Sequence, residues 1–562
     1  MRRLALLLAA GVLAPAPAAQ AATVSIPHGS FLLFEAAPGE ENRVSMETTD
    51  GITYTVVDAG APLTPGPGCA AVDAHRATCT APGPTASAVS VRTGDRSDLV
   101  ALEGIRSPLC TSANIDGGEG DDTIRTITAS ACWGGGFTAD GGPGNDHLSV
   151  TDHQFDLVGG PGDDVLVLNA ASGDAKGGEG DDRIVPSTAD QDQMDGGPGS
   201  DVLDYSARTG DLWVDLAAGH YDSGEEDEYD KAVEFEGVLG GSGDDILLGT
   251  KHADTLSGGP GDDVVDGRAG PDVLFGGLGD DLADYSTRFA PVTVRLDGTP
   301  TSGSDGESDR VATDVEHVWG GAGPDTLIGN AGDNLLNGGY GADALHGGAG
   351  DDIADYSERD EDLTLRLGGT PDSGSPADSR GDAIATDIEA VVSGAGDDTI
   401  DSLDGRGADI DCGPGRDQVF VDPGDRHEHC ESITIADPIW AFGHNTPQPS
   451  PPNPVAPPIP VLDPLPTVKL TLPARTRRQA LTRGFTFTAT CSQACRLTAR
   501  LHRGGTTLAR GQAGASGRVQ LRFTAAGKRA LRGDARVRAT LEVRAVDRRG
   551  RAVTVRRTFT LR

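Results

Sequence analysis

The chain is poor in the side chains that build a conventional hydrophobic core. Aromatic residues make up 4% of its 562 residues and only 3 are methionine, whereas 80 are glycine. Glycine adds no side chain to a core and loses the most backbone entropy on folding. We therefore expect something besides apolar burial to stabilise this fold.

Long hydrophobic runs are also missing, apart from one near the start. Arg2 and Arg3 precede an apolar run over residues 4–13, and Ala19-Gln20-Ala21 follows as a small-x-small cleavage pattern. An N-terminal membrane anchor is the alternative, but the run is too short for a hydrocarbon core about 30 Å thick. We interpret residues 1–21 as a signal peptide and expect a secreted protein with no integral membrane segment.

Positive charge is scarce over most of the chain, whose formal net charge is −40. Residues 468–562 contain 23 Lys and Arg against 3 Asp and Glu, a net of +20, which leaves −60 for residues 1–467. Carboxylates at that density repel one another in a compact state unless cations neutralise them. A hard, oxygen-seeking cation such as Ca²⁺ is the natural candidate.

Catalytic motifs are absent as well. The sequence has no H-E-x-x-H for a zinc protease and no G-x-S-x-G nucleophile elbow. Paired carboxylates occur throughout, so they say nothing about acid-base catalysis. We expect no catalytic residues and a protein that is not an enzyme.

Eight cysteines fall into four local pairs, as is typical of an oxidising compartment, and we expect disulfides. The pairs are Cys69 with Cys79, Cys110 with Cys132, Cys412 with Cys430, and Cys491 with Cys495. The alternative is a zinc site around Cys412, His427, His429 and Cys430, whose spacing fits no four-ligand zinc pattern. We expect the two histidines to be loop residues.

What the chain has instead is a repeat of nine residues. GGSGDDILL begins at residue 240 and further copies follow at 249, 258, 267 and 276; a second block begins at 320, 329, 338 and 347. Looser copies begin at 117, 141, 159, 177 and 196, and the steps of 18 residues among them imply a degenerate half-turn between copies. Such a period predicts a solenoid of stacked turns.

The repeat has the composition of a calcium loop. Glycines allow a tight turn and leave carbonyl groups uncovered, the sixth residue supplies a carboxylate, and the eighth, for example Leu247 or Val265, points into a thin core. The predicted ligands are Asp122, Asp146, Asp164, Asp182, Asp201, Asp245, Asp254, Asp263, Asp272, Asp281, Asp325, Asn334, Asp343, Asp352 and Asp398. The predicted loop glycines are Gly240, Gly241, Gly243, Gly258, Gly259, Gly261, Gly276, Gly277, Gly279, Gly320, Gly321, Gly323, Gly338, Gly339, Gly341, Gly347, Gly348 and Gly350. A single match would also suit a solvated turn, but nine copies in register favour calcium.

If one repeat makes half a turn, alternate repeats stack at about 4.8 Å. Asp245, Asp263 and Asp281 then form one row, with Asp254 and Asp272 opposite. Likewise Asp325 faces Asp343 and Asn334 faces Asp352, where the missing charge should weaken binding. The loop at 249, with Thr250, Lys251 and His252 in place of small residues, is a doubtful calcium site.

The remaining segments frame the repeats. Asp-Tyr-Ser occurs at 204–206, 284–286 and 355–357, each time before an insert with a short alternating strand, an acidic loop and a return strand. Residues 22–115 predict an N-terminal β segment capping the solenoid of residues 116–435. Residues 436–467 form a proline-rich linker, and residues 468–562 alternate like a basic, immunoglobulin-like β-sandwich.

Over residues 117–431 the chain resembles the RTX, or haemolysin-type calcium-binding, family. The resemblance implies an all-β protein with a right-handed parallel β-roll, disordered without Ca²⁺ and folded by several Ca²⁺ ions at millimolar levels outside cells. The signal peptide and basic domain depart from the Gram-negative members, so type I export is not implied. The segment IDCGPGRDQVFVDPGDRHEHCESI looks like the closing cap of secreted proteins from high-GC Gram-positive bacteria.

Two functions remain open. The first is a calcium-dependent structural or adhesive protein of the cell surface or extracellular matrix. The second is an enzyme or accessory module acting on polysaccharide, because similar inserts occur in alginate-modifying enzymes. The basic domain suits an anionic cell-wall polymer as partner; specific nucleic-acid binding is poorly supported, and a solvated strand face is the plain alternative.

Overall fold

The computed structural model describes residues 21–27, 31–48, 52–81, 88–105, 112–127, 136–151, 155–169, 173–188, 191–217, 223–225, 228, 230–369, 373–374, 381–435 and the strands within 468–561. The regular elements among these residues are β-strands. The chain divides into two compact units, Met1–Gly321 and Ala322–Arg562. In the described part of the chain, no helix has the length and apolar character needed to cross a bilayer. The predicted signal peptide, apart from residue 21, and the linker lie outside the described residues.

The first unit starts with antiparallel strands that cover one end of a parallel stack. These first strands are β1 (Ala22–Ser25), β2 (Phe31–Glu35), β3 (Arg43–Thr48), β4 (Thr53–Asp58), β5 (Leu63–Pro65), β6 (Cys69–Ala71), β7 (Arg76–Thr80), β8 (Ala88–Asp95) and β9 (Leu99–Ile105). β3, β4, β7 and β6 form an antiparallel meander, whereas β2 pairs in parallel with β8 and β3 with β9. The stack therefore begins near residue 31, before the predicted boundary at 115, because these early turns keep the winding without the glycine loops.

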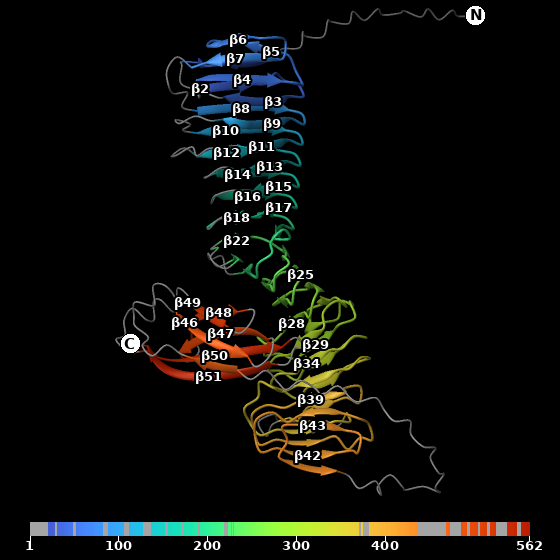
Figure 1. Ribbon diagram of the computed structural model, residues 1–562. Helices are drawn as coiled ribbons and strands as arrows, with labels where there is room; N and C mark the ends of the chain where they lie inside the picture. Colours follow the sequence, from blue (N-terminus) through green and yellow to red (C-terminus); the bar gives the residue numbers. More distant parts are fainter. Residues whose placement is uncertain are drawn as a thin grey trace, which may run out of the picture. The chain divides into compact units, whose positions relative to one another are not determined.

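Alternate strands of the stack enter two parallel sheets (Figure 1). One sheet continues from β8 with β10 (Ala113–Glu119), β12 (Phe137–Asp140), β14 (Phe155–Pro161), β16 (Asp174–Glu179), β18 (Gln193–Asp195) and β22 (Lys231–Val233). The other continues from β9 with β11 (Thr123–Ile127), β13 (His147–Val150), β15 (Val165–Leu168), β17 (Arg183–Val185), β19 (Val202–Asp204), β23 (Gly237–Leu239), β25 (Thr255–Pro260), β27 (Val273–Leu278) and β31 (Arg310–Val311). Leu148 pairs with Leu166, so one full turn is 18 residues here and one repeat is half a turn, as predicted.

A third run of strands completes the first unit. It consists of β21 (Gly224–Glu225), β20 (Leu212–Asp215), β24 (Ile246–Leu248), β26 (Val264–Asp266), β28 (Leu282–Asp284) and β32 (His317–Trp319); β29 (Val292–Arg295) pairs with β30 (Gly303–Ser304) in the second insert. The repeat strands on this side are three residues long. Leu247 and Val265, at the eighth position, are fully buried, so the thin core is confirmed.

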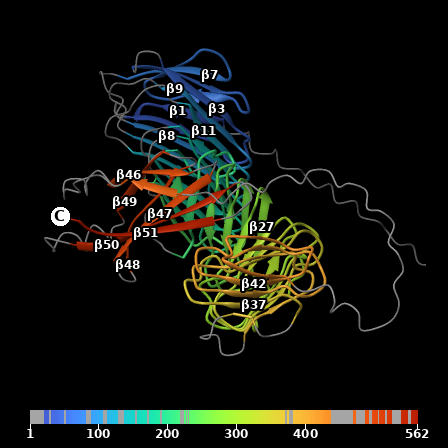
Figure 2. The ribbon, with the colours of Figure 1, turned by 60° about the horizontal axis from the view of Figure 1, so that its bottom comes forward.

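The second unit repeats this winding (Figure 2). Its parallel strands are β33 (Thr326–Ile328), β35 (Ala344–His346) and β38 (Ala383–Ile384); β34 (Leu335–Asn337), β36 (Ile353–Asp355), β39 (Ala390–Val392), β41 (Asp409–Asp411) and β43 (Arg426–Glu428); and β37 (Thr364–Arg366), β40 (Thr399–Asp401), β42 (Gln418–Val421) and β44 (Ser432–Ile435). In Figure 2 the yellow and orange turns near β37 and β42 lie over one another as successive coils. The predicted parallel solenoid is therefore present in both units.

The basic C-terminal region is an antiparallel sheet of seven described strands. They are β45 (Val468–Thr471), β46 (Phe485–Cys491), β47 (Cys495–Arg503), β48 (Thr506–Ala513), β49 (Gly517–Phe523), β50 (Val537–Asp547) and β51 (Ala552–Leu561). Their order is β45-β46-β49-β48-β47-β50-β51, with β49 joining the two halves. The predicted strands are present, and the immunoglobulin-like sandwich stays a prediction.

We predict that Leu166→Ala destabilises the calcium-loaded roll by about 2–5 kcal/mol, because it opens a cavity in a core one residue deep. Val167→Ala, on the half-buried opposite face of β15, should cost about 1 kcal/mol or less. Urea unfolding in saturating calcium measures both changes. Equal effects would mean that this layer of the roll is not a packed core.

Candidate metal sites

Carboxylates at the sixth repeat position join successive turns. Along a row, the backbone N–H of one residue donates to a carboxylate oxygen of the equivalent residue one turn later, as when the Asp146 N–H donates to Asp164 Oδ1 at 2.7 Å. One row runs through Asp98, Asp122, Asp146, Asp164, Asp182 and Asp201 to Glu236, with N···O distances of 2.7 to 3.0 Å. The side chains predicted as ligands are therefore brought into line by the winding itself.

Shorter rows of the same design follow. In the first unit they are Asp245, Asp263, Asp281 and Glu316, and Asp254, Asp272 and Asp309. In the second unit they are Asp325, Asp343 and Asp382; Asn334, Asp352 and Glu389; and Asp398, Asp417 and Glu431. The pairings predicted from the period of nine are confirmed.

The second oxygen of most row aspartates is buried and lacks a hydrogen-bond partner. These Oδ2 atoms belong to Asp98, Asp122, Asp146, Asp164, Asp182, Asp201, Asp263, Asp272, Asp281, Asp352, Asp398 and Asp417. A buried anionic oxygen without a partner costs more free energy than a hydrogen bond returns. Because such atoms recur along a row, bound cations would stabilise the fold by neutralising them.

The first glycine of each loop leaves open the space that the unpartnered oxygen faces. A Cβ on Gly159 would lie 2.2 Å from Asp164 Oδ2 and 2.6 Å from the carbonyl oxygen of Gly177 in the next turn. The second glycine, Gly160, has a φ of 122°, which favours glycine. Carboxylate and carbonyl oxygens converging on one spot form the donor set that Ca²⁺ prefers, so the residues fit this ion. When bound, the ion would supply the positive charge that these buried carboxylates lack.

Burial has a strong effect on the protonation of the rows. Desolvation, followed by repulsion from neighbouring aspartates, raises the pKa of Asp164 to about 7 although a backbone N–H lowers it. Asp281, which precedes Glu316 in its row, has a pKa of about 8, mainly through burial and then through Asp263 and Glu316. Without a cation, Asp164 and Asp281 therefore hold protons near neutral pH in the folded state.

Three predicted ligands already have a donor for the oxygen that faces the loop. Thr250 donates its N–H and its hydroxyl to Asp254 Oδ2, at 2.5 and 3.0 Å. Gly241 donates to Asp245 Oδ2 at 2.7 Å, and Asn330 to Asn334 Oδ1 at 2.7 Å. These contacts are consistent with weaker calcium binding at the loop at 249 and at Asn334, as expected from the sequence. Asp245 joins them, because its loop-facing oxygen also accepts a hydrogen bond from the protein.

At the inserts, the last aspartate of a row is hydrogen-bonded to a buried tyrosine hydroxyl. Asp309 and Asp382 end their rows at the point where an insert returns to the stack, and Asp230 does the same in a further, short row with Asp192. Their Oδ2 atoms accept hydrogen bonds from Tyr205 at 3.5 Å, Tyr285 at 3.0 Å and Tyr356 at 2.9 Å. All three tyrosines are buried, so at these row ends a hydroxyl contacts the carboxylate oxygen that elsewhere lacks a protein partner.

Several row members were missed from the sequence. Asp98 lies in TGDRSDLVA and Asp417 in CGPGRDQVF, which keep the sixth aspartate and the second glycine but replace the first glycine with threonine or cysteine. Glu236 and its equivalents Glu316, Glu389 and Glu431 stand in the same place at row ends. The usable signal was an acidic residue two positions before a buried apolar one, which does not depend on glycine.

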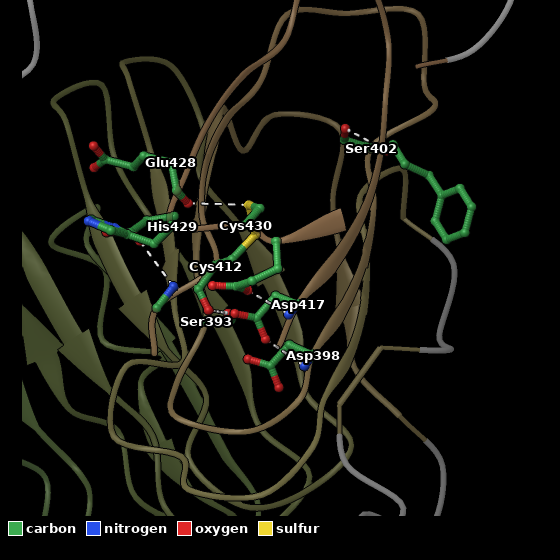
Figure 3. Close-up of a disulfide and its surroundings, with 12 residues drawn as sticks. Ser393, Asp398, Ser402, Cys412, Asp417, Glu428, His429 and Cys430 are labelled. Carbon is green, nitrogen blue, oxygen red and sulfur yellow. Dashed lines mark hydrogen bonds and ion pairs between the residues drawn. A yellow bond between two sulfur atoms is a disulfide. The ribbon is translucent and has the colours of Figure 1, made fainter. Parts of the chain in front are cut away.

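Two predicted disulfides are present, Cys69–Cys79 and Cys412–Cys430. The second is drawn in Figure 3 and removes both sulfurs as ligands, so the cysteine-based zinc alternative is wrong. Cys110 and Cys132 lie outside the described residues. Pairing of Cys491 with Cys495, at the ends of β46 and β47, stays a prediction.

The comparisons with known proteins agree with this geometry. Four stretches, residues 114–126, 239–274, 248–283 and 319–354, match the family model of the RTX calcium-binding nonapeptide repeat. No curated protein matches the chain. The matched stretches contain Asp122 and most of the rows that start at Asp245, Asp254, Asp325 and Asn334.

We predict that Asp164→Asn raises the calcium concentration needed for folding, because it removes one charge and the unpartnered Oδ2 while leaving an oxygen for the Asp146 N–H. The affinity of that site should fall roughly tenfold, the equivalent of about 1.4 kcal/mol. Asp163→Asn is the matched control, since it changes the charge equally at an exposed neighbouring position. A calcium titration followed by circular dichroism compares them, and equal shifts would point to general charge effects instead of coordination.

In calcium-free buffer, we predict that the folded roll loses stability as pH rises from about 4 to about 7. Asp122 and Asp164 have pKa values of about 7 when folded, against about 3.9 in an unfolded chain. Between these two pKa values the folded state binds more protons than the unfolded chain. The free energy of unfolding is therefore highest below pH 4 and falls as the pH rises through this range. Circular dichroism across this pH range measures the loss, which saturating calcium should abolish. A calcium-free β signal that grows with pH would contradict it.

Proposed function

We propose that this protein, which carries RTX calcium-binding repeats, is a secreted scaffold that folds on calcium and has a structural or adhesive role at the cell surface. The observation that carries the proposal is the rows of buried aspartates whose Oδ2 atoms lack a protein partner. Such a chain is stable only where calcium is plentiful, and loops of modest affinity suit extracellular calcium levels. Folding is thereby delayed until the chain is outside the cell.

The contacts between the inserts and the stack support a structural role. Tyr205, Tyr285 and Tyr356 are buried and hydrogen-bonded to row aspartates. Arg208 and Arg288 lie over the rings of Tyr205 and Tyr285 and form ion pairs with insert glutamates. The Asp-Tyr-Ser signature and its insert thus serve to continue the stack. The polysaccharide-acting alternative would need turnover of a glycan by the isolated protein.

The basic C-terminal region supplies the means of attachment. Its net charge of +20 contrasts with −60 for the rest of the chain. A surface of this sign attracts anionic wall polymers over a distance set by the Debye length. We therefore propose that residues 468–562 hold the protein to the wall while the calcium-folded roll extends from it. No specific nucleic acid is part of this proposal.

We predict that the mature chain sediments with cell-wall sacculi that carry anionic polymers and is released by salt. Binding should fall steeply between about 0.1 M and 1 M salt, as the Debye length drops from about 10 Å to about 3 Å. A chain ending at residue 467 should stay in the supernatant, although its calcium-dependent circular dichroism is unchanged.

Sacculi stripped of their anionic polymers are the control and should bind neither chain. Binding that persists in high salt, or that the shortened chain retains, would overturn electrostatic attachment through the basic domain. Release of product from the sacculi by the mature chain would favour the polysaccharide-acting alternative.

A further inference from the structure

The last turns of the second unit carry metal-ligating side chains that the calcium rows do not use. Asp411 ends β41, Glu428 ends β43, and the two residues face each other in the parallel register. One ligand atom from each of Asp411, Glu428 and His429 lies within 4.8 Å of the others. In Figure 3 the side chains of Glu428 and His429 extend to the same side, away from the sulfur atoms of Cys412 and Cys430.

The fold fixes this arrangement through neighbouring contacts. The disulfide Cys412–Cys430 joins the residues that follow each strand, and the Cys412 N–H donates to the Glu428 carbonyl at 3.1 Å. His429 has a φ of 56°, in the left-handed region, and its Nδ1 lies 2.8 Å from Asp411 Oδ1. The imidazole is thus held against the carboxylate of the adjacent turn.

Asp411 is a buried carboxylate with one oxygen that no protein group satisfies. It is only 7% exposed, and its Oδ1 accepts from the Gly413 N–H at 3.0 Å and faces His429. Its Oδ2 has no hydrogen-bond partner. At the equivalent ninth repeat position, Asp204 Oδ2 pairs with Arg183, and Asp401 Oδ2 pairs with Arg366 at 3.2 Å. Where those aspartates meet an arginine, Asp411 meets a second carboxylate and an imidazole.

We propose that Asp411, Glu428 and His429 form a binding site for a divalent transition-metal ion such as zinc, separate from the calcium rows. One imidazole nitrogen with two carboxylates suits zinc and its neighbours, whereas calcium takes oxygen ligands. The His429 side chain is 43% exposed, so water can reach the site and complete the coordination. Cys412 and Cys430 are not among its ligands, because their sulfur atoms are paired in the disulfide.

The position of the site gives it a structural consequence. Asp411 and Glu428 belong to successive strands of one sheet, β41 and β43. An ion held by both, and by the residue after β43, ties these strands together next to the disulfide. The site therefore reinforces the closing turns of the roll by a bond that does not depend on the aspartate rows.

The test is a zinc titration of the full mature chain in saturating calcium, which fills the oxygen-only sites, under non-reducing conditions that keep the sulfurs paired. Isothermal titration calorimetry should show one tight zinc equivalent. His429→Asn, in which asparagine tolerates the left-handed backbone, should weaken it by at least about tenfold, and Asp411→Asn likewise. His427→Asn is the matched control, because His427 lies in β43 itself, exposed and outside the cluster, instead of in the predicted loop.

Copper(II) bound in place of zinc provides a readout that folding defects do not imitate. Its electron paramagnetic resonance spectrum should show coupling to one imidazole nitrogen in the mature chain and in His427→Asn, and none in His429→Asn. The proposal is overturned if zinc binds only weakly at many sites, or if His429→Asn keeps both the tight equivalent and the nitrogen coupling while its circular dichroism in calcium is normal.

Discussion

The structure depends on one interaction, in which an aspartate at the sixth repeat position uses its two oxygens for different purposes. Oδ1 of Asp164 accepts the backbone N–H of Asp146 in the previous turn, while Oδ2 stays buried without a protein partner. The first contact sets the stacking of turns, and the second leaves a buried carboxylate oxygen that we propose a cation neutralises. Geometry and ion dependence thus reside in the same side chain.

The thin core explains why such a device is needed. Each repeat buries one fully enclosed apolar residue, such as Leu247 or Leu166, in strands as short as three residues. Burial on this scale offsets little of the entropy lost by a glycine-rich loop. Where an insert interrupts the repeats, Tyr285 donates to Asp309, so at that point a protein hydroxyl satisfies the buried carboxylate oxygen.

The first and last turns of the roll differ from its middle in how they are stabilised. Antiparallel strands β4, β6 and β7 and the disulfide Cys69–Cys79 cover the first turns. The closing turns have Cys412–Cys430 beside the cluster of Asp411, Glu428 and His429. Terminal repeats of a solenoid have a neighbour on one side only, so a disulfide, and the metal ion that we propose at this cluster, would add stability where stacking adds least.

The sequence by itself determined the repeat length, the half-turn, the inward residue at position eight and the rows from Asp245 and Asp325, because a strict period of nine leaves a single register. It could not reveal Asp98, Asp417 or the glutamates at row ends, because none of their loops begins with the pair of glycines that marks a repeat. Nor could it show that Thr250 satisfies Asp254, or that Tyr205 is buried against Asp230. Only the tertiary structure decides these points, since they depend on which residue of a distant turn the winding places beside each carboxylate.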